Sequence, residues 1–202
     1  MLPIYFDMDN TLSRTSDYQK QEVEKELIKI GDLEGLEEFK FWCMSGEPRY
    51  KYPSPYNTML SDIIKNKDYI LNLKPTPLFN YFFLTPGNKP KMSVFNILTH
   101  RGEDIEAKNL TSQWIHSFKP CVDIKEIHSI SHKKNPSKIE YLSKLHPDGN
   151  FIIVDDNPMF YTDKEHPYHK QIRIFDMYDK YEIAYKNQIK VTYYKGFFDL
   201  HL

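Results

Sequence analysis

Two aspartates, Asp7 and Asp9, follow the first apolar run of the chain and are separated by one residue. In an extended segment such a pair points to the same side, because side chains alternate along a strand. Carboxylates that close repel one another unless a cation lies between them or one is protonated. A magnesium ion meets that need, since it binds one or two carboxylates together with water and phosphate oxygens. The alternative is an ordinary turn with solvated acids.

A second acidic pair, Asp155 and Asp156, directly follows the apolar run at residues 150–154. Adjacent acids after a buried strand are costly to place near other carboxylates without a metal. A turn broken by Asn157 and Pro158 is the alternative. Two acidic strand ends at one sheet edge would make a shared cation site the better interpretation.

The apolar run at residues 92–98 ends in Thr99, which His100, Arg101 and Gly102 follow. A hydroxyl at a sheet edge, with free backbone N–H groups and a glycine behind it, suits phosphate oxygens. A threonine that closes a strand is also commonplace. We interpret His100 and Arg101 as a cationic pair that binds a further anionic group of a substrate.

A lysine is the remaining phosphate-binding candidate. Asn135 resembles a helix N-cap and Pro136 the first helical residue, which places Lys138 in the first turn. A lysine there opposes the helix dipole, and a buried anion nearby would offset that cost. Lys134 is the competing candidate, and a solvated surface lysine is the alternative for both.

The elements that would carry these residues alternate along the chain. Short, nearly continuous apolar runs suit a parallel sheet covered on both faces. Helical spacing of apolar residues indicates crossover helices at residues 103–118 and 137–145. We therefore predict an α/β fold with a Rossmann-like parallel sheet and a ligand crevice at the carboxyl ends of its strands. The expected strands lie at residues 2–6, 92–98, 124–130, 150–154 and 171–175.

A long interval separates the first two predicted strands, far more than one crossover needs. It contains two helical patterns, which Asp17 and Asn57 are expected to cap. We predict a small helical insertion, followed by a helix that returns to the second strand. The expected ranges are a core of 1–13 and 75–202, an insertion of 14–74 with helices at 17–43 and 57–71, and a returning helix at 75–84. Residues 176–202, with Val191 and Phe197, would add an edge strand or cover the sheet.

Composition excludes several classes of protein. With 27 basic and 28 acidic residues in 202, the formal charge of −1 argues against a generally polybasic nucleic-acid or membrane binder. Two cysteines, Cys43 and Cys121, exclude a disulfide scaffold or a cysteine-built zinc site. No apolar run approaches the roughly 20 residues that span a bilayer. Because Asp7 interrupts the opening residues early, we expect no targeting segment there and a cytoplasmic location.

In chain order, the candidates form Asp-x-Asp-x-Thr at residues 7–11, then Thr99, then a lysine at a helix start, then Asp155 and Asp156. This order resembles the haloacid dehalogenase superfamily of phosphotransferases. A response-regulator receiver uses similar residue types but places its acidic pair first, so the order argues against it. The resemblance spans residues 7–156 and implies a core of this superfamily's type, with a helical cap inserted after the first strand.

The resemblance implies that Asp7 is the nucleophile, which forms an aspartyl-phosphate that water later hydrolyses. It implies that Asp9 protonates the leaving oxygen, activates the attacking water and contacts the metal through its backbone carbonyl. Family members that cleave carbon–halogen bonds lack an acid at the position of Asp9. Hydrolysis of phosphate esters is therefore favoured over dehalogenation.

The resemblance also implies Mg²⁺ as the cofactor. Asp156 would be its direct carboxylate ligand, with Asp155 in or near the same coordination shell. Thr99 and Lys138 would hold the phosphoryl oxygens while charge shifts in the transition state.

The cap implied by the resemblance closes over the site and selects small molecules. Trp42, within it, is a candidate to stack on a base, and packing of the cap itself is the alternative. The motifs look most like those of deoxyribonucleotidases, so the expected substrate is a small phosphorylated metabolite, most simply a nucleoside monophosphate. No membrane partner is expected.

Two rival functions remain open. One is a 3′-phosphatase for DNA or RNA ends, as in the phosphatase half of polynucleotide kinase, which predicts a basic strip at Arg101, Lys133 and Lys134. The other is a non-catalytic module that keeps this fold for partner binding.

Overall fold

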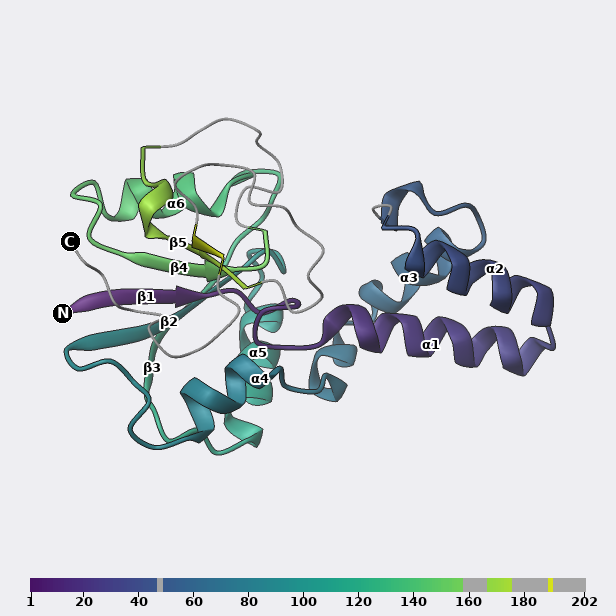
Figure 1. Cartoon of the computed structure of the whole chain (residues 1–202), viewed down its shortest axis with the longest axis horizontal. Coiled ribbons are helices and arrows are strands. Elements are labelled where there is room, and N and C mark those ends of the chain that lie inside the picture. Colours follow the sequence, from purple (N-terminus) through teal and green to yellow (C-terminus); the bar gives the residue numbers. More distant parts are fainter. Residues whose placement is uncertain (47–48, 158–166, 176–188, 191–202) are drawn as a thin grey trace. The chain divides into compact units, whose positions relative to one another are not determined.

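A computed structural model describes residues 1–46, 49–157, 167–175 and 189–190 (Figure 1). The chain divides into two compact units. The first, the sheet unit, consists of residues 1–13 and 75–202, and the second, the helical unit, consists of residues 14–74. These are the ranges expected from the sequence, whereas a capping role for the helical unit stays a prediction.

The strands of the sheet unit form one sheet in which neighbouring strands are parallel, in the order β3-β2-β1-β4-β5-β6. This confirms an α/β fold with a Rossmann-like parallel sheet. The chain builds outward from β1 in one direction and then restarts on its other side with β4, which makes the carboxyl ends of β1 and β4 the usual place for a ligand. The strand bounds are β1 Leu2–Phe6, β2 Ser93–Thr99, β3 Ile124–Ser129, β4 Ile152–Asp155, β5 Ile172–Ile174 and β6 Ile189–Lys190.

Apolar side chains of the strands pack on both faces of the sheet, as a doubly covered parallel sheet requires. On one face, Tyr5 and Ile153 belong to a buried cluster with Leu142 of helix α6. On the other, the ring of Phe6 lies 5.2 Å from that of Phe83. Figure 1 accordingly shows α6 on one side of the sheet and α4 and α5 on the other. The helical segments of this unit are α4 Pro77–Phe79, a π-helical turn at Asn80–Leu84, α5 Ile105–Ser117, α6 Lys138–Leu145 and a 3-10 turn at His169–Gln171.

Helix α6 begins later than the sequence suggested, and the expected N-cap at Asn135 and first helical residue at Pro136 are wrong. The cap is Ser137, whose hydroxyl accepts a hydrogen bond from the backbone N–H of Glu140 at 3.3 Å. The backbone N–H of Asn135 instead donates to the carbonyl of Ser131, which keeps this residue in the preceding turn. Lys138 is thus the first residue of the helix.

The first helix expected in the helical unit, residues 17–43, is divided into two helices. Gly31 adopts a φ of 76°, a left-handed conformation that ends α1, and Asp32 caps α2 by accepting from the N–H of Gly35. Asp17 is not a cap, because α1 has already begun at Thr15. The bounds are α1 Thr15–Ile30, α2 Leu33–Met44, α3 Tyr56–Lys65 and 3-10 segments at Arg49–Lys51 and Lys67–Asn72.

The second expected helix, residues 57–71, is also divided. Helix α3 starts one residue before Asn57, so this residue is not its cap, and Pro55 occupies the N-cap position. Asn66 ends α3 and caps the following 3-10 segment through the N–H of Asp68. The returning helix expected at residues 75–84 is short and widens into a π-helical turn, after Thr76 caps it through the N–H of Phe79.

The two junctions between the helical unit and the sheet unit are far apart in the sequence but paired in the structure. Ser13 and Pro75 form an antiparallel bridge. The next residues outward are also paired, since the backbone N–H of Arg14 donates to the carbonyl of Lys74 at 2.8 Å.

The expected contribution of the C-terminal residues mostly lies outside the described part of the chain. Val191, Phe197 and Pro158 are among the residues that are not described. Residues 189–190 form β6, which pairs with β5.

Replacing Ser137 by alanine should lower the free energy of unfolding by about 1 kcal/mol, because the first turn of α6 loses its capping oxygen. Urea unfolding followed by circular dichroism measures this change. Ser143→Ala is the matched control, since its hydroxyl only donates to the carbonyl of Glu140 on the exposed side of the same helix. The control should change by less than about 0.5 kcal/mol, and equal losses for both variants would contradict the assigned cap.

Candidate functional site

Pairing between β1 and β4 brings the two acidic segments together. Phe6 lies opposite Val154, and the backbone N–H of Asp7 donates to the carbonyl of Val154 at 2.9 Å. One residue further along each strand, Asp7 therefore stands beside Asp155. The backbone N–H of Asp156 donates to the hydroxyl of Thr11 at 3.0 Å, which fixes the turn after β4 to the turn after β1.

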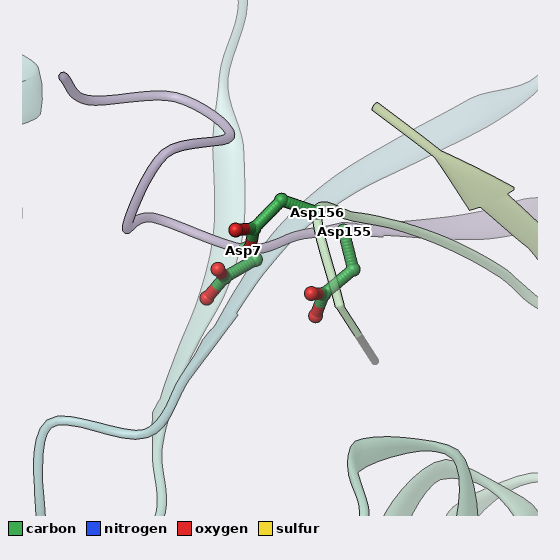
Figure 2. A group of neighbouring side chains, drawn as sticks. All are labelled: Asp7, Asp155 and Asp156. Atoms are coloured by element: carbon green, nitrogen blue, oxygen red, sulfur yellow. The ribbon is translucent and has the colours of Figure 1, made fainter. Parts of the chain in front are cut away.

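The carboxyl groups of Asp7, Asp155 and Asp156 converge, each with an oxygen within 4.8 Å of the others (Figure 2). Asp7 and Asp155 are buried and Asp156 is half-buried. The group contains no histidine or cysteine, so its ligands are carboxylate oxygens alone. Hard cations with oxygen ligands, such as Mg²⁺, suit this set better than zinc or copper. The cluster could bind a metal ion.

Lys138 lies between two of these carboxylates. Its ammonium nitrogen is 2.6 Å from Oδ1 of Asp7 and 2.7 Å from Oδ2 of Asp155, and the side chain is buried. Burial alone would lower the pKa of Lys138, but the carboxylates of Asp155 and Asp7 raise it above its usual value. The lysine therefore stays charged. One positive charge against three carboxylates leaves a formal charge of −2 for a cation to neutralise.

The competing lysine, Lys134, is placed elsewhere. Its ammonium group binds Glu103 at 2.6 Å on the surface of the sheet unit. The structure therefore separates the two candidates, since only Lys138 contacts the acidic cluster.

The carboxyl groups of Asp7 and Asp156 bind protons more tightly than usual. Burial, helped by the neighbouring carboxylates of Asp155 and Asp9 and opposed by Lys138, raises the pKa of Asp7 from 3.8 to about 7. Burial and the charges of Asp155 and Asp7 raise the pKa of Asp156 well above its ordinary value. A divalent cation would replace these protons and restore the ionised carboxylates.

Thr99 closes β2, the strand next to β1, and its side chain is fully buried. Its hydroxyl finds no hydrogen-bond partner among the residues that the structure describes. An unsatisfied buried hydroxyl costs about 1–3 kcal/mol, which is why such groups usually have a partner. A ligand oxygen at the sheet edge would supply one.

Asp9 does not join the acidic cluster with its side chain. The guanidinium of Arg101 holds it at both oxygens, with Nε 3.0 Å from Oδ2 and Nη2 2.7 Å from Oδ1. Arg101, which we expected to bind substrate, binds a second candidate residue in this structure, and a contact with substrate stays a prediction. Sequence reasoning missed this pair, although opposite charges after two neighbouring strands were a signal for it. A contact between the backbone carbonyl of Asp9 and a metal stays a prediction.

His100 is neutral near pH 7, so the expected cationic pair reduces to Arg101. Burial, with a smaller contribution from the charge of Lys138, lowers the pKa of His100 to about 4. A neutral imidazole must donate from Nε2, because this atom lies 2.8 Å from the backbone carbonyl oxygen of Asn135. His100 therefore ties the loop after β2 to the loop before α6.

Trp42 belongs to the helical unit. It is half-buried and packs against that unit's hydrophobic cluster, with its ring 6.0 Å from that of Tyr52. This arrangement supports the packing alternative for Trp42, and a contact with substrate stays a prediction.

Magnesium should raise the melting temperature, and by more at about pH 8 than at about pH 5. The protonated Asp7 carboxyl contributes stability that is present below its unfolded pKa of about 4 and is lost as pH rises through about 7. A cation compensates for that loss, so its effect grows with pH. Differential scanning fluorimetry should give a shift of about 5 °C or more at saturating Mg²⁺ and about pH 8.

Asp156→Asn is the matched variant for this experiment, because it removes one negative charge from the ligand set and keeps the shape of the side chain. It should shrink the shift at every pH. If Mg²⁺ leaves the melting temperature of the wild-type protein unchanged across the whole pH range, the result would contradict the cation site.

No family model matches this chain, and no curated protein matches its sequence. Within the described residues, none of the helices has both the length and the apolar character to cross a membrane. Interpretation of the site therefore depends on the geometry of its own side chains.

Proposed function

We propose that the protein is a Mg²⁺-dependent phosphomonoester hydrolase that works through an aspartyl-phosphate. The observation that carries this proposal is the buried group of three carboxylates, Asp7, Asp155 and Asp156, matched by one lysine at the point where the sheet order reverses. Such a site favours a divalent cation and, through it, an anionic ligand.

Mg²⁺ would be held by Asp7, Asp155 and Asp156, whose oxygens are the ligands it prefers. When bound, the ion would supply positive charge that polarises the phosphoryl group. The same charge would reduce the repulsion between the negatively charged phosphoryl group and the carboxylates.

Asp7 is the proposed nucleophile because it opens the Asp-x-Asp-x-Thr pattern at residues 7–11, and its carboxylate lies against Lys138. One of its carboxylate oxygens attacks phosphorus, and the bond from phosphorus to the ester oxygen breaks. Lys138 contacts Asp7 at this sheet edge, and the hydroxyl of Thr99 has no partner among the described residues, so both would hold the phosphoryl oxygens. Water then attacks phosphorus, which releases inorganic phosphate and restores the Asp7 carboxylate.

A small phosphorylated metabolite is the proposed substrate class, with a nucleoside monophosphate as its first candidate. The rival that acts on nucleic-acid ends relies on a basic strip at Arg101, Lys133 and Lys134. Two of these cations are already paired, Arg101 with Asp9 and Lys134 with Glu103. Their pairing favours the small substrate, because fewer free cations remain for a polymer backbone.

Asp7→Asn should reduce phosphatase activity by about 10³-fold or more, because an amide cannot form the phosphoenzyme. Release of inorganic phosphate from a set of phosphorylated metabolites measures this. Asp148→Asn is the matched control, since this exposed acid lies in a turn where its oxygen accepts from the N–H of Asn150. Wild-type activity in Asp7→Asn, with the control unaffected, would remove the nucleophile from this proposal.

Chelation by EDTA should abolish turnover, and added Mg²⁺ should restore it, because without a cation the cluster keeps protons on the groups that must be ionised. The same phosphate-release assay serves, with calcium as a comparison cation of larger radius. Turnover that persists in EDTA would refute the proposed metal role.

A further inference from the structure

We infer that Arg101 is a positioning residue for Asp9, and that it orients and stabilises the Asp9 carboxylate that forms when Asp9 gives its proton to the leaving oxygen. This inference rests on the proposed function and extends it to a residue outside the metal and phosphate groups. Its basis is the two-pronged ion pair, in which Nε and Nη2 of Arg101 each reach a different oxygen of Asp9.

Exposure distinguishes the roles of the two partners. The side chain of Arg101 is 5% exposed, whereas that of Asp9 is 32% exposed. The two donors Nε and Nη2 form the fork of the guanidinium. A buried guanidinium whose fork already binds a carboxylate is poorly placed to bind a substrate. Asp9 stays accessible, so a leaving group can approach the carboxyl group while Arg101 holds it from behind.

The backbone around Arg101 is anchored on β3 and its side chain on α5. The N–H of the next residue, Gly102, donates to the carbonyl of Ile130 at 3.2 Å, and the hydroxyl of Ser129 donates to the carbonyl of Gly102. The third nitrogen of the guanidinium, Nη1, lies 3.4 Å from the hydroxyl of Thr111, a fully buried residue of α5. These contacts restrict the fork to one orientation, as positioning requires.

The fork matches one protonation form of Asp9 better than the other. An ionised carboxylate offers both oxygens to two N–H donors, and such charge-assisted pairs are about twice as strong as neutral hydrogen bonds. A protonated carboxyl group keeps one hydroxyl, which weakens one of the two bonds. The interaction therefore strengthens as the proton leaves, which is the condition for lowering a barrier rather than tightening ground-state binding.

The proton follows a balanced route through both half-reactions. As Asp7 attacks and the bond from phosphorus to the ester oxygen breaks, the proton of Asp9 moves to that oxygen and an alcohol departs. The Asp9 carboxylate then takes a proton from the attacking water. The bond from phosphorus to Asp7 breaks, inorganic phosphate leaves, and Asp9 is protonated for the next cycle.

A structural role for Arg101 is the competing explanation, because its charge also offsets that of Asp9 near Asp7. The two roles differ in their dependence on the leaving group. An alkoxide needs a proton to depart, whereas 4-nitrophenolate departs as a stable anion. Because kcat/KM reports steps up to formation of the phosphoenzyme, it isolates proton donation from the later activation of water.

The experiment compares kcat/KM for an alkyl phosphate, adenosine 5′-monophosphate or glycerol 3-phosphate, with that for 4-nitrophenyl phosphate. Arg101→Gln should lower the value for the alkyl ester by about 10²-fold and that for the aryl ester by less than about 5-fold. Arg101→Lys, which keeps the charge without the fork, should fall between wild type and Arg101→Gln. Thr111→Val should show a smaller loss with the same leaving-group dependence.

Combining variants tests whether Arg101 acts through Asp9. In an Asp9→Asn background, Arg101→Gln should lower kcat/KM for the alkyl ester no further, since the group to be positioned has gone. Equal losses for both esters, or full additivity with Asp9→Asn, would overturn the inference. If Arg101→Gln does not fold, Arg101→Lys and Thr111→Val carry the same comparison.

The outcomes also separate this inference from the proposed function. A wild-type protein that hydrolyses neither ester in Mg²⁺ would refute the phosphatase itself. A wild-type protein that hydrolyses both, with an Arg101→Gln variant that retains activity on the alkyl ester, would refute the role of Arg101 alone.

Discussion

Three carboxylates from two strand ends share a buried space with one ammonium group, and the rest of the site follows from that imbalance. Parallel pairing of β1 with β4 leaves no room to separate Asp7 from Asp155. Lys138 neutralises part of the charge, and its own position depends on α6 starting at Lys138, directly after the Ser137 cap. The remaining negative charge is either protonated or matched by a cation, so the chemistry of the site is tied to the geometry of the sheet.

Electrostatics divide the two aspartates of the first strand end between different partners. Asp7 faces inward, where the ammonium of Lys138 and the carboxylates of β4 lie. Asp9 is held by a guanidinium that comes from the loop after β2. Two carboxyl groups separated by one residue thus have different environments, as the proposed nucleophile and the proposed proton donor need. His100, kept neutral by burial, adds no charge to either of them.

Local patterns in the sequence were sufficient to predict the strands and the acidic strand ends, because apolar runs and abrupt polar stops depend on neighbouring residues. They could not identify Lys138 over Lys134, since that choice depends on which side chain the turn before α6 delivers to the carboxylates. The pairing of Arg101 with Asp9 joins residues 92 positions apart, and the neutrality of His100 arises from burial. Predictions of helix starts were wrong where a nearby hydroxyl or carbonyl formed the competing hydrogen bond, as at Asn135.

The backbone pairing of Ser13 with Pro75 and of Arg14 with Lys74 has a consequence for how the chain can evolve. The insertion of residues 14–74 begins and ends at backbone segments that are paired with each other. The sheet unit therefore keeps the same backbone at this junction whatever sequence the insertion has. Insertions or exchanges within residues 14–74 need not disturb the backbone that carries Asp7 and Asp9. Natural selection could thus remodel this appendage while the chemistry on the sheet stays untouched.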